Sequence, residues 1–366
     1  MDQVFSRATV HVAYFNANKV LHFSALETTM DHVSLPGTDI QVSALCLGVA
    51  EIGIRQTEIQ AHGLLDFWVQ NGGNCIDTAR VYSDWIPGEK HRSERILGDW
   101  LRAAGVRKQI VLATKAGHPL LEDLLRVRLS PSELRQDLEG SLETLGTDYI
   151  DLWWLHRDDE SVPVEEIMDC CDAFVRNGRV KALGVSNWAA KRIREANDYA
   201  LRAGRTRFVA TQLFWNLGSC HYRGLESTVR SMDADAEQLH REAKLVAMPY
   251  SSQAGGFFSD WLEGDDVART NAERSGYATK TNFQIARLVR EIARRNGVPA
   301  GAVVLGFLRS HSFNVVPIVG CSTPSHLAAS IKALDLVLSD ADWNSLRELT
   351  SHKTGWFSKY LWKRGS

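Results

Sequence analysis

Four side chains that can move or tune a proton lie at intervals along the first half of the chain. They are Asp77, Tyr82, Lys115 and His156, with Lys115 38 residues after Asp77 and His156 41 residues after Lys115. A phenol with a pKa near ~10 is a poor proton donor at neutral pH unless a cation and a hydrogen-bond donor stabilise its anion. Lys115 and His156 could supply these, and Asp77 could keep Lys115 charged. The set therefore suits protonation of a carbonyl oxygen while a hydride reaches its carbon.

The segments that must position these residues alternate short apolar runs with longer stretches of helical period. This alternation is typical of a parallel α/β sheet, whose strands are covered on both faces. The predicted strands are residues 44–48, 74–77, 110–114, 149–155, 180–185, 208–213, 245–249 and 314–319. The predicted helices are residues 59–71, 92–104, 131–145, 164–177, 189–203, 225–242, 281–296, 300–311 and 324–334. Eight such strand and helix units predict one (β/α)₈ TIM barrel.

A doubly wound sheet is the alternative fold. Such a sheet usually carries a GxGxxG turn after its first strand, and the glycines after the first predicted strand, Gly48 and Gly53, lack that spacing. The turn at residues 35–39 predicts a hairpin that plugs the N-terminal end of the barrel. Residues that follow successive strands of a barrel share its C-terminal rim, so we expect the four side chains to meet there among long loops.

Each of the four residues also has an ordinary structural explanation. Tyr82 could pack in a core, Lys115 could lie on the surface, Asp77 could cap a helix, and His156 could be a hydrogen-bonded residue at a strand end. The chemical interpretation therefore depends on their convergence, which only the barrel provides.

The composition excludes several classes of protein. The 366 residues are 44% hydrophobic and 23% charged, with 42 basic and 44 acidic side chains and no basic tract that would bind nucleic acid. There is no apolar run of ~18 residues that could span a membrane, and no cysteine or histidine spacing typical of a metal site. Residues 1–20 lack the basic head and the small-residue cleavage site that are typical of a secretory leader. We expect a cytoplasmic protein in which residues 1–29 are an extension outside the barrel, residues 30–350 form the barrel, and residues 351–366 are a C-terminal tail.

Six short motifs resemble the signature blocks of the aldo-keto reductase superfamily, in the family's order and over residues 31–350. They are Asp77-Thr-Ala-Arg-Val-Tyr82, Ser93-Glu-Arg-Ile-Leu-Gly98, Ala113-Thr-Lys115, Asp151-Leu-Trp-Trp-Leu-His156, Gly184-Val-Ser-Asn187 and Pro317-Ile-Val-Gly320. The resemblance implies a (β/α)₈ barrel that uses NADPH or NADH without a metal. It also implies that Asp77, Tyr82, Lys115 and His156 are the catalytic tetrad.

The resemblance extends to the cofactor site. Ser186, Asn187 and Gln212 match residues that bind the nicotinamide carboxamide, and Trp215 falls where an aromatic ring stacks on the nicotinamide. The loop that begins at Tyr250 resembles one that wraps a pyrophosphate. The full implied set is Gly48, Ser186, Asn187, Gln212, Trp215, Tyr250, Ser251, Ser252, Gln253, Gly255, Gly320, Ser322, His326 and Ser330.

The segment after the last predicted strand departs from the family's pattern. The family commonly has Arg or Lys there for the 2′-phosphate of NADP and a terminal Asn for adenine, whereas residues 320–330 offer only His326 as a cation and Ser330 in place of Asn. We therefore expect NADH and NADPH to bind with similar affinities, with NADPH gaining as the pH falls.

The sequence indicates the substrate less clearly. Trp85 lies near Tyr82 in a long loop, and Arg157 follows His156, so both are candidate contacts for a small aldehyde, ketone or sugar-like carbonyl. Packing of Trp85 within its own loop is an equal alternative. Two other functions remain open: transient sugar oxidation by a tightly bound NAD, leading to elimination or epimerisation, and a regulatory subunit that binds cofactor with little turnover. The intact tetrad disfavours the second of these.

Overall fold

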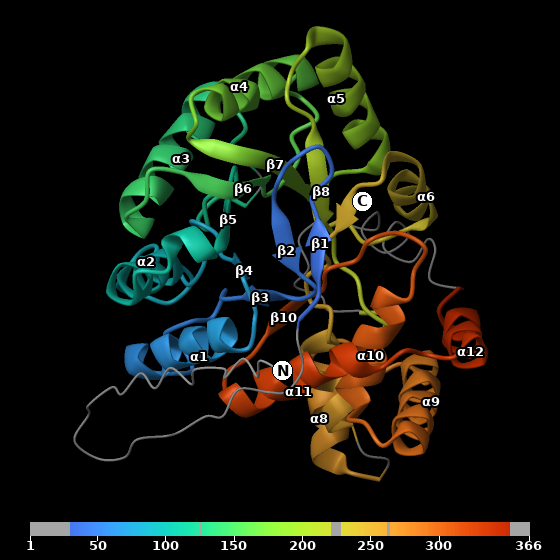
Figure 1. Cartoon of the computed structure of the whole chain (residues 1–366). Coiled ribbons are helices and arrows are strands. Elements are labelled where there is room, and N and C mark those ends of the chain that lie inside the picture. Colours follow the sequence, from blue (N-terminus) through green and yellow to red (C-terminus); the bar gives the residue numbers. More distant parts are fainter. Residues whose placement is uncertain (1–29, 125, 221–227, 262–263, 352–366) are drawn as a thin grey trace, which may run out of the picture.

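A computed structural model describes residues 30–351, except 125, 221–227 and 262–263. Its main sheet contains eight parallel strands in the order β10-β3-β4-β5-β6-β7-β8-β9, which curls into the barrel of Figure 1. The barrel closes where the segment that leads into β10 bonds to β9: Ala247 N donates to Asn314 O at 2.9 Å and Val316 N donates to Ala247 O at 2.8 Å. The fold is therefore the predicted (β/α)₈ barrel.

The strands are short and the helices form the outer layer. The strands are β1 (His32–Ser34), β2 (Gln41–Ser43), β3 (Cys46–Gly48), β4 (Cys75–Asp77), β5 (Val111–Ala116), β6 (Ile150–Leu155), β7 (Val180–Ser186), β8 (Phe208–Gln212), β9 (Val246–Ala247) and β10 (Ile318–Gly320). The α-helices are α1 (Glu58–Gln70), α2 (Arg92–Ala104), α3 (Pro131–Leu145), α4 (Val164–Arg176), α5 (Ala190–Ala203), α6 (Ala234–Ala243), α7 (Phe257–Asp260), α8 (Asp266–Arg274), α9 (Lys280–Asn296), α10 (Ala300–Arg309), α11 (Pro324–Lys332) and α12 (Asp340–Ser351).

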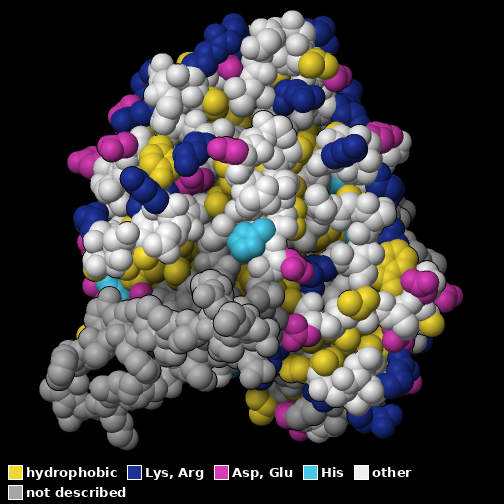
Figure 2. Space-filling model, viewed as in Figure 1, with side chains coloured by type: hydrophobic (Ala, Val, Ile, Leu, Met, Phe, Trp, Pro, Cys, Tyr) yellow, Lys and Arg dark blue, Asp and Glu magenta, His cyan; other side chains and the backbone are white. Residues whose placement is uncertain are grey.

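The hairpin of β1 and β2 closes one end of the barrel, as predicted. The two strands pair antiparallel, and in Figure 1 they lie across the barrel at its near end. Leu35, Ile40 and Val42 of the hairpin belong to the same buried cluster as side chains from inside the barrel, such as Leu152 and Val316. Figure 2 shows that acidic and basic side chains are interspersed over this hairpin face.

Alternation along the strands sends one set of side chains into the barrel. On β5, Val111 and Ala113 belong to the interior cluster, whereas Leu112 packs with the helices outside. Side chains two residues apart share a face of a strand, so Lys115 also points into the barrel. The same two-residue alternation, counted on the other strands, places four further side chains on the interior side at the carboxyl ends of their strands: Asp77, His156, Ser186 and Gln212.

The structure corrects the predicted helix 225–242. Helix α6 begins at Ala234, because Asp233 accepts a hydrogen bond from Ala236 N and so ends the preceding loop as an N-cap. Residues 230–232 instead pair with Phe214: Phe214 N donates to Arg230 O and Met232 N donates to Phe214 O. Helices α7, α8 and α12 were not predicted.

The predicted extension, residues 1–29, lies outside the described residues, as does the predicted tail 351–366 apart from Ser351, which ends helix α12. No helix in the described part of the chain is both long and apolar enough to cross a membrane.

Candidate active site

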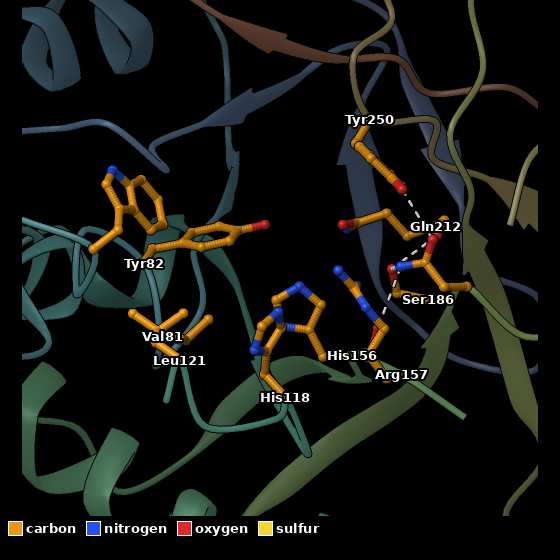
Figure 3. Close-up of a pocket in the computed structure, with 11 residues that line it drawn as sticks. Val81, Tyr82, His118, Leu121, His156, Arg157, Ser186, Gln212 and Tyr250 are labelled. Atoms are coloured by element: carbon orange, nitrogen blue, oxygen red, sulfur yellow. Dashed lines mark hydrogen bonds between the residues drawn. The ribbon is translucent and has the colours of Figure 1, made fainter. Parts of the chain in front are cut away.

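A cavity of about 280 Å³ opens where the predicted tetrad converges. Loops that follow β4, β5, β6, β7 and β9 contribute to its wall, together with the ends of β7 and β8. Its lining residues are Val81, Tyr82, Trp85, His118, Leu121, His156, Arg157, Ser186, Asn187, Gln212 and Tyr250 (Figure 3).

A buried ion pair forms the base of the site. Lys115 and Asp77 are only 1% and 2% exposed, and their side chains are in direct hydrogen-bond contact. Lys115 Nζ also donates to Thr78 O at 2.7 Å. Burial opposes a charge on Lys115, but the neighbouring Asp77 and Tyr82 outweigh it and raise the pKa of Lys115. Lys115 is therefore a cation held beneath the cavity.

Tyr82 lies directly over this cation. The ammonium of Lys115 is 4.6 Å from the centre of the Tyr82 ring. In Figure 3 the Tyr82 hydroxyl points into the cavity, toward Gln212 on the opposite wall. Burial raises the pKa of Tyr82, and Lys115 offsets only part of that rise. The phenol thus keeps its proton at neutral pH, and the net direction differs from the lowered value that the tetrad suggested.

His156 forms a second side of the cavity. Its ring is edge-on to that of Tyr82, with 5.8 Å between centres, and also edge-on to His118, with 4.6 Å between centres. Burial and the nearby groups His118, Arg157 and Lys115 lower the pKa of His156 well below its usual value, so the imidazole is neutral at pH 7. Its Nδ1 atom is buried and has no hydrogen-bond partner among the described residues.

The Ser93–Gly98 block supports the site from behind without lining it. Ser93 Oγ donates to Val49 O at 2.7 Å and lies 2.8 Å from the hydroxyl of Thr78, next to Asp77. Glu94 is fully buried and accepts a 2.6 Å bond from Thr114 Oγ1, next to Lys115. Gly98 permits close packing of α2 against α3, since a Cβ there would lie 2.6 Å from Thr144 O. This block fixes the ends of β4 and β5.

Three polar side chains from β7 and β8 line the wall near Tyr250. Ser186 Oγ donates to Gln212 O at 2.9 Å, and Asn187 Nδ2 donates to Ser186 Oγ at 2.9 Å. The Tyr250 hydroxyl donates to Asn187 Oδ1 at 2.9 Å. Asn187 adopts a left-handed backbone conformation with φ 61°, a strained state that often occurs at functional sites. These amide and hydroxyl groups match the donors and acceptors of a carboxamide.

A second group of predicted cofactor residues lies beside the first, around the start of α11. Ser252 Oγ donates to Ile318 O at 2.6 Å, and Gln253 Nε2 donates to Ser330 Oγ at 3.1 Å. Gly48 and Gly320 pair at the ends of β3 and β10. Helix α11 has Thr323 as its N-cap and Pro324 in its first turn. The other members of this second group are Ser251, Gly255, Ser322 and His326. No residue of this second group lines the described cavity.

Trp215 also lies away from the cavity lining. Its ring packs edge-on to His311 and stacks with Phe313, with 4.7 and 6.1 Å between centres. The aromatic ring that does line the cavity beside Asn187 is Tyr250. The nicotinamide-stacking role of Trp215 stays a prediction.

Sequence reasoning placed Trp85 and Arg157 in the substrate region, and both line the cavity. It missed Val81, His118 and Leu121. His118 carried a usable signal, because it follows the end of β5 three residues after Lys115. Val81 and Leu121 are apolar loop residues whose types carry no such signal.

Within the described residues, no three His, Cys, Asp or Glu side chains are placed to hold a metal ion. All six cysteines lie in this part of the chain and are free thiols.

Comparison with known proteins identifies the family. The model of the aldo/keto reductase family matches residues 44–351. The chain belongs to the aldo/keto reductase family. It is similar to norsolorinic acid reductase stcV of Emericella nidulans, with 31% identity over 342 residues, 90% of this chain and 83% of that protein. Aryl-alcohol dehydrogenase [NADP(+)] of Phanerodontia chrysosporium is 29% identical over 356 residues, 90% of this chain and 88% of that protein.

A further relative is aryl-alcohol dehydrogenase GME11368 of Pestalotiopsis microspora, 29% identical over 339 residues, 89% of this chain and 83% of that protein. This aldo/keto reductase is an NAD(P)-dependent oxidoreductase that acts on small carbonyl compounds or the corresponding alcohols.

Proposed function

We propose that this aldo/keto reductase reduces aldehydes or ketones to alcohols with Tyr82 as the general acid. The observation that carries the proposal is the position of the Tyr82 phenol. It lies over the Lys115 cation, edge-on to neutral His156, in a cavity that also contains Ser186, Asn187 and Gln212. A protonated phenol beside a cation suits a site in which an alkoxide must gain a proton.

The donor set around Ser186, Asn187 and Gln212 fits a nicotinamide. Their neutral amides and hydroxyl face the cavity, where a carboxamide could pair with them, and the Tyr250 ring offers an adjacent aromatic surface. When bound, NADPH or NADH would supply the hydride. The residues around Gln253 and Ser330 and the N-terminus of α11 are proposed to hold the remainder of the cofactor.

The protein's own groups handle the proton. The hydroxyl of Tyr82 transfers its proton to the substrate oxygen, and Lys115 stabilises the phenolate that remains. Neutral His156 can donate one N–H bond to the same substrate oxygen. Because Nδ1 of His156 is buried without a partner, we place this hydrogen on Nε2. Solvent then returns a proton to Tyr82.

The substrate proposed here is an aromatic aldehyde or ketone. Two of the relatives named above are called aryl-alcohol dehydrogenases. In this chain Val81, Trp85 and Leu121 line the cavity with apolar surface, and the rings of Trp85 and Tyr82 are 6.3 Å apart at 67°. A flat ring could pack between such walls while its carbonyl reaches Tyr82.

A panel of carbonyl compounds tests this function at the nicotinamide absorbance. We expect turnover of benzaldehydes, and we expect Trp85→Ala to raise KM for them far more than for a small aliphatic aldehyde. Trp85 is 46% exposed, so loss of its ring is expected to change substrate contact more than stability. Leu201→Ala, at a helix position that is 65% exposed and remote from the cavity lining, is the matched control. Equal increases in KM for both aldehydes would assign Trp85 to loop packing.

The two cofactors are expected to bind with dissociation constants within about tenfold of each other at pH 7.5, a difference of ~1.4 kcal/mol or less. The reason is that residues 320–330 contain no Arg or Lys, and charge-assisted bonds to a 2′-phosphate are normally the source of NADP preference. Direct titration of NADH and NADPH measures this ratio. A hundredfold preference for NADPH would show that a basic residue from another segment reaches the phosphate.

A further inference from the structure

We infer that Gln212 is a positioning residue that holds the buried Asp77–Lys115 pair in its productive state and ties that pair to the cofactor wall. The inference rests on the proposed function, because it concerns the groups that tune Tyr82. Gln212 Nε2 donates to Asp77 Oδ1 at 3.0 Å, while the other oxygen of the same carboxylate contacts Lys115. Gln212 is 1% exposed and comes from β8, on the far side of the barrel from β4.

Gln212 meets the cofactor wall through its other groups. Its backbone oxygen accepts bonds from Ser186 Oγ at 2.9 Å and from Asn187 N at 3.2 Å. Its side chain lines the cavity, and Figure 3 shows it extending toward Tyr82. One residue thus contacts the ion pair, the Ser186 side chain, the Asn187 backbone and the space where a ligand would lie.

The ion pair needs the hydrogen bond from Gln212 because both of its side chains are almost completely buried. A carboxylate of this kind stays ionised only when donors satisfy it, and burial favours transfer of the Lys115 proton to Asp77, which would leave both groups neutral. Burial raises the pKa of Asp77 above its usual value, and Lys115 and then the amide of Gln212 offset part of that rise by stabilising the ionised carboxylate. The indole of Trp154 acts in the same direction, although its Nε1 atom makes no hydrogen bond within the described residues.

Loss of the Gln212 amide would change the pKa of Tyr82 through the charge on Lys115. Without the amide of Gln212, Asp77 holds a proton more readily and Lys115 carries less positive charge. Among the charged groups around Tyr82, Lys115 and Arg157 lower its pKa against the effect of burial and Asp77 raises it, and the effect of Lys115 is larger than that of Asp77. Loss of the amide therefore raises the pKa of Tyr82, and oxidation of an alcohol, which needs the phenolate, moves to higher pH.

The test is the pH dependence of kcat for alcohol oxidation at saturating oxidised cofactor. Gln212→Met keeps the length of the side chain and removes the donor. We expect the midpoint of its profile, the pH at which kcat is half of its maximum, to rise by one pH unit or more. At pH values below the midpoint kcat therefore falls at least tenfold, and it recovers as the pH rises. A purely structural or purely cofactor-binding role would lower kcat or raise the cofactor dissociation constant without moving the midpoint.

Ser186→Ala is the matched control, because Ser186 bonds the backbone of Gln212 but does not touch Asp77. We expect it to weaken cofactor binding and leave the midpoint in place. If Gln212→Met does not fold, Gln212→Glu gives a second test: its ionised carboxylate repels Asp77, so we expect the midpoint to rise in this variant too. An unchanged midpoint in whichever variant folds overturns the inference. Absence of turnover in the wild-type protein would instead overturn the proposed function.

Discussion

Replacement of Tyr82 with phenylalanine is expected to lower kcat for carbonyl reduction by ~10²- to 10⁴-fold, the range that general acid catalysis typically supplies. The change removes one oxygen atom and keeps the ring that packs against Lys115, His156 and Trp85. Cofactor binding is therefore expected to persist. Steady-state turnover and cofactor titration on the same preparation measure the two effects separately.

The control for this variant is Tyr199→Phe, which removes a hydroxyl whose partner is Asp169 on helix α4, outside the cavity. We expect it to retain wild-type turnover. If Tyr82→Phe also retained turnover, the proton would have to come from His156, and the role assigned to Lys115 would lose its basis.

Replacement of Lys115 with methionine is expected to cost both activity and stability. It removes the cation under Tyr82, which should lower kcat on the order of 10²-fold or more. It also leaves Asp77 buried without its ionic partner, which typically lowers the free energy of unfolding by about 3–5 kcal/mol. Chemical denaturation and turnover assays check the two parts.

The double variant Asp77→Asn with Lys115→Met separates these effects. It removes both charges from the buried site, so we expect most of the lost stability to return, while kcat stays low because no cation faces the phenol. Recovery of activity together with stability would show that Lys115 acts only through the fold.

The barrel and the convergence of the tetrad were predictable because both follow from periodic patterns. Parallel strands with two covered faces are almost continuously apolar, and residues that follow such strands share one rim. Lys115 illustrates the point: its position at the end of β5 was enough to place it beside Asp77. The hairpin plug was equally visible, since its turn sits between apolar residues that enter the barrel.

The elements that escaped prediction lack such patterns. Helix α8 buries only Ala268 and Ala272, so it has no apolar stripe to recognise. The start of α6 depends on Asp233 and on backbone pairing with Phe214, a long-range contact that periodicity cannot reveal.

The details of the site depend on three-dimensional contacts as well. The position of Tyr250 in the cavity wall and the packing of Trp215 against His311 and Phe313 depend on which way each loop side chain turns. The net rise in the pKa of Tyr82 follows from the depth of burial, which the sequence does not state. The bond between Gln212 and Asp77 joins residues 135 positions apart and appears only when the barrel closes.

The most direct test of the proposed reaction is its stoichiometry. Purified protein is incubated with a limiting amount of NADPH and an excess of an aromatic aldehyde; cofactor loss is followed by absorbance, and the alcohol is measured by chromatography. Net reduction predicts one alcohol formed for each cofactor oxidised, and almost none of either in the Tyr82→Phe variant. Conversion of a substrate without net cofactor loss, or cofactor binding without product, would contradict the proposed function and favour transient oxidation or a regulatory role.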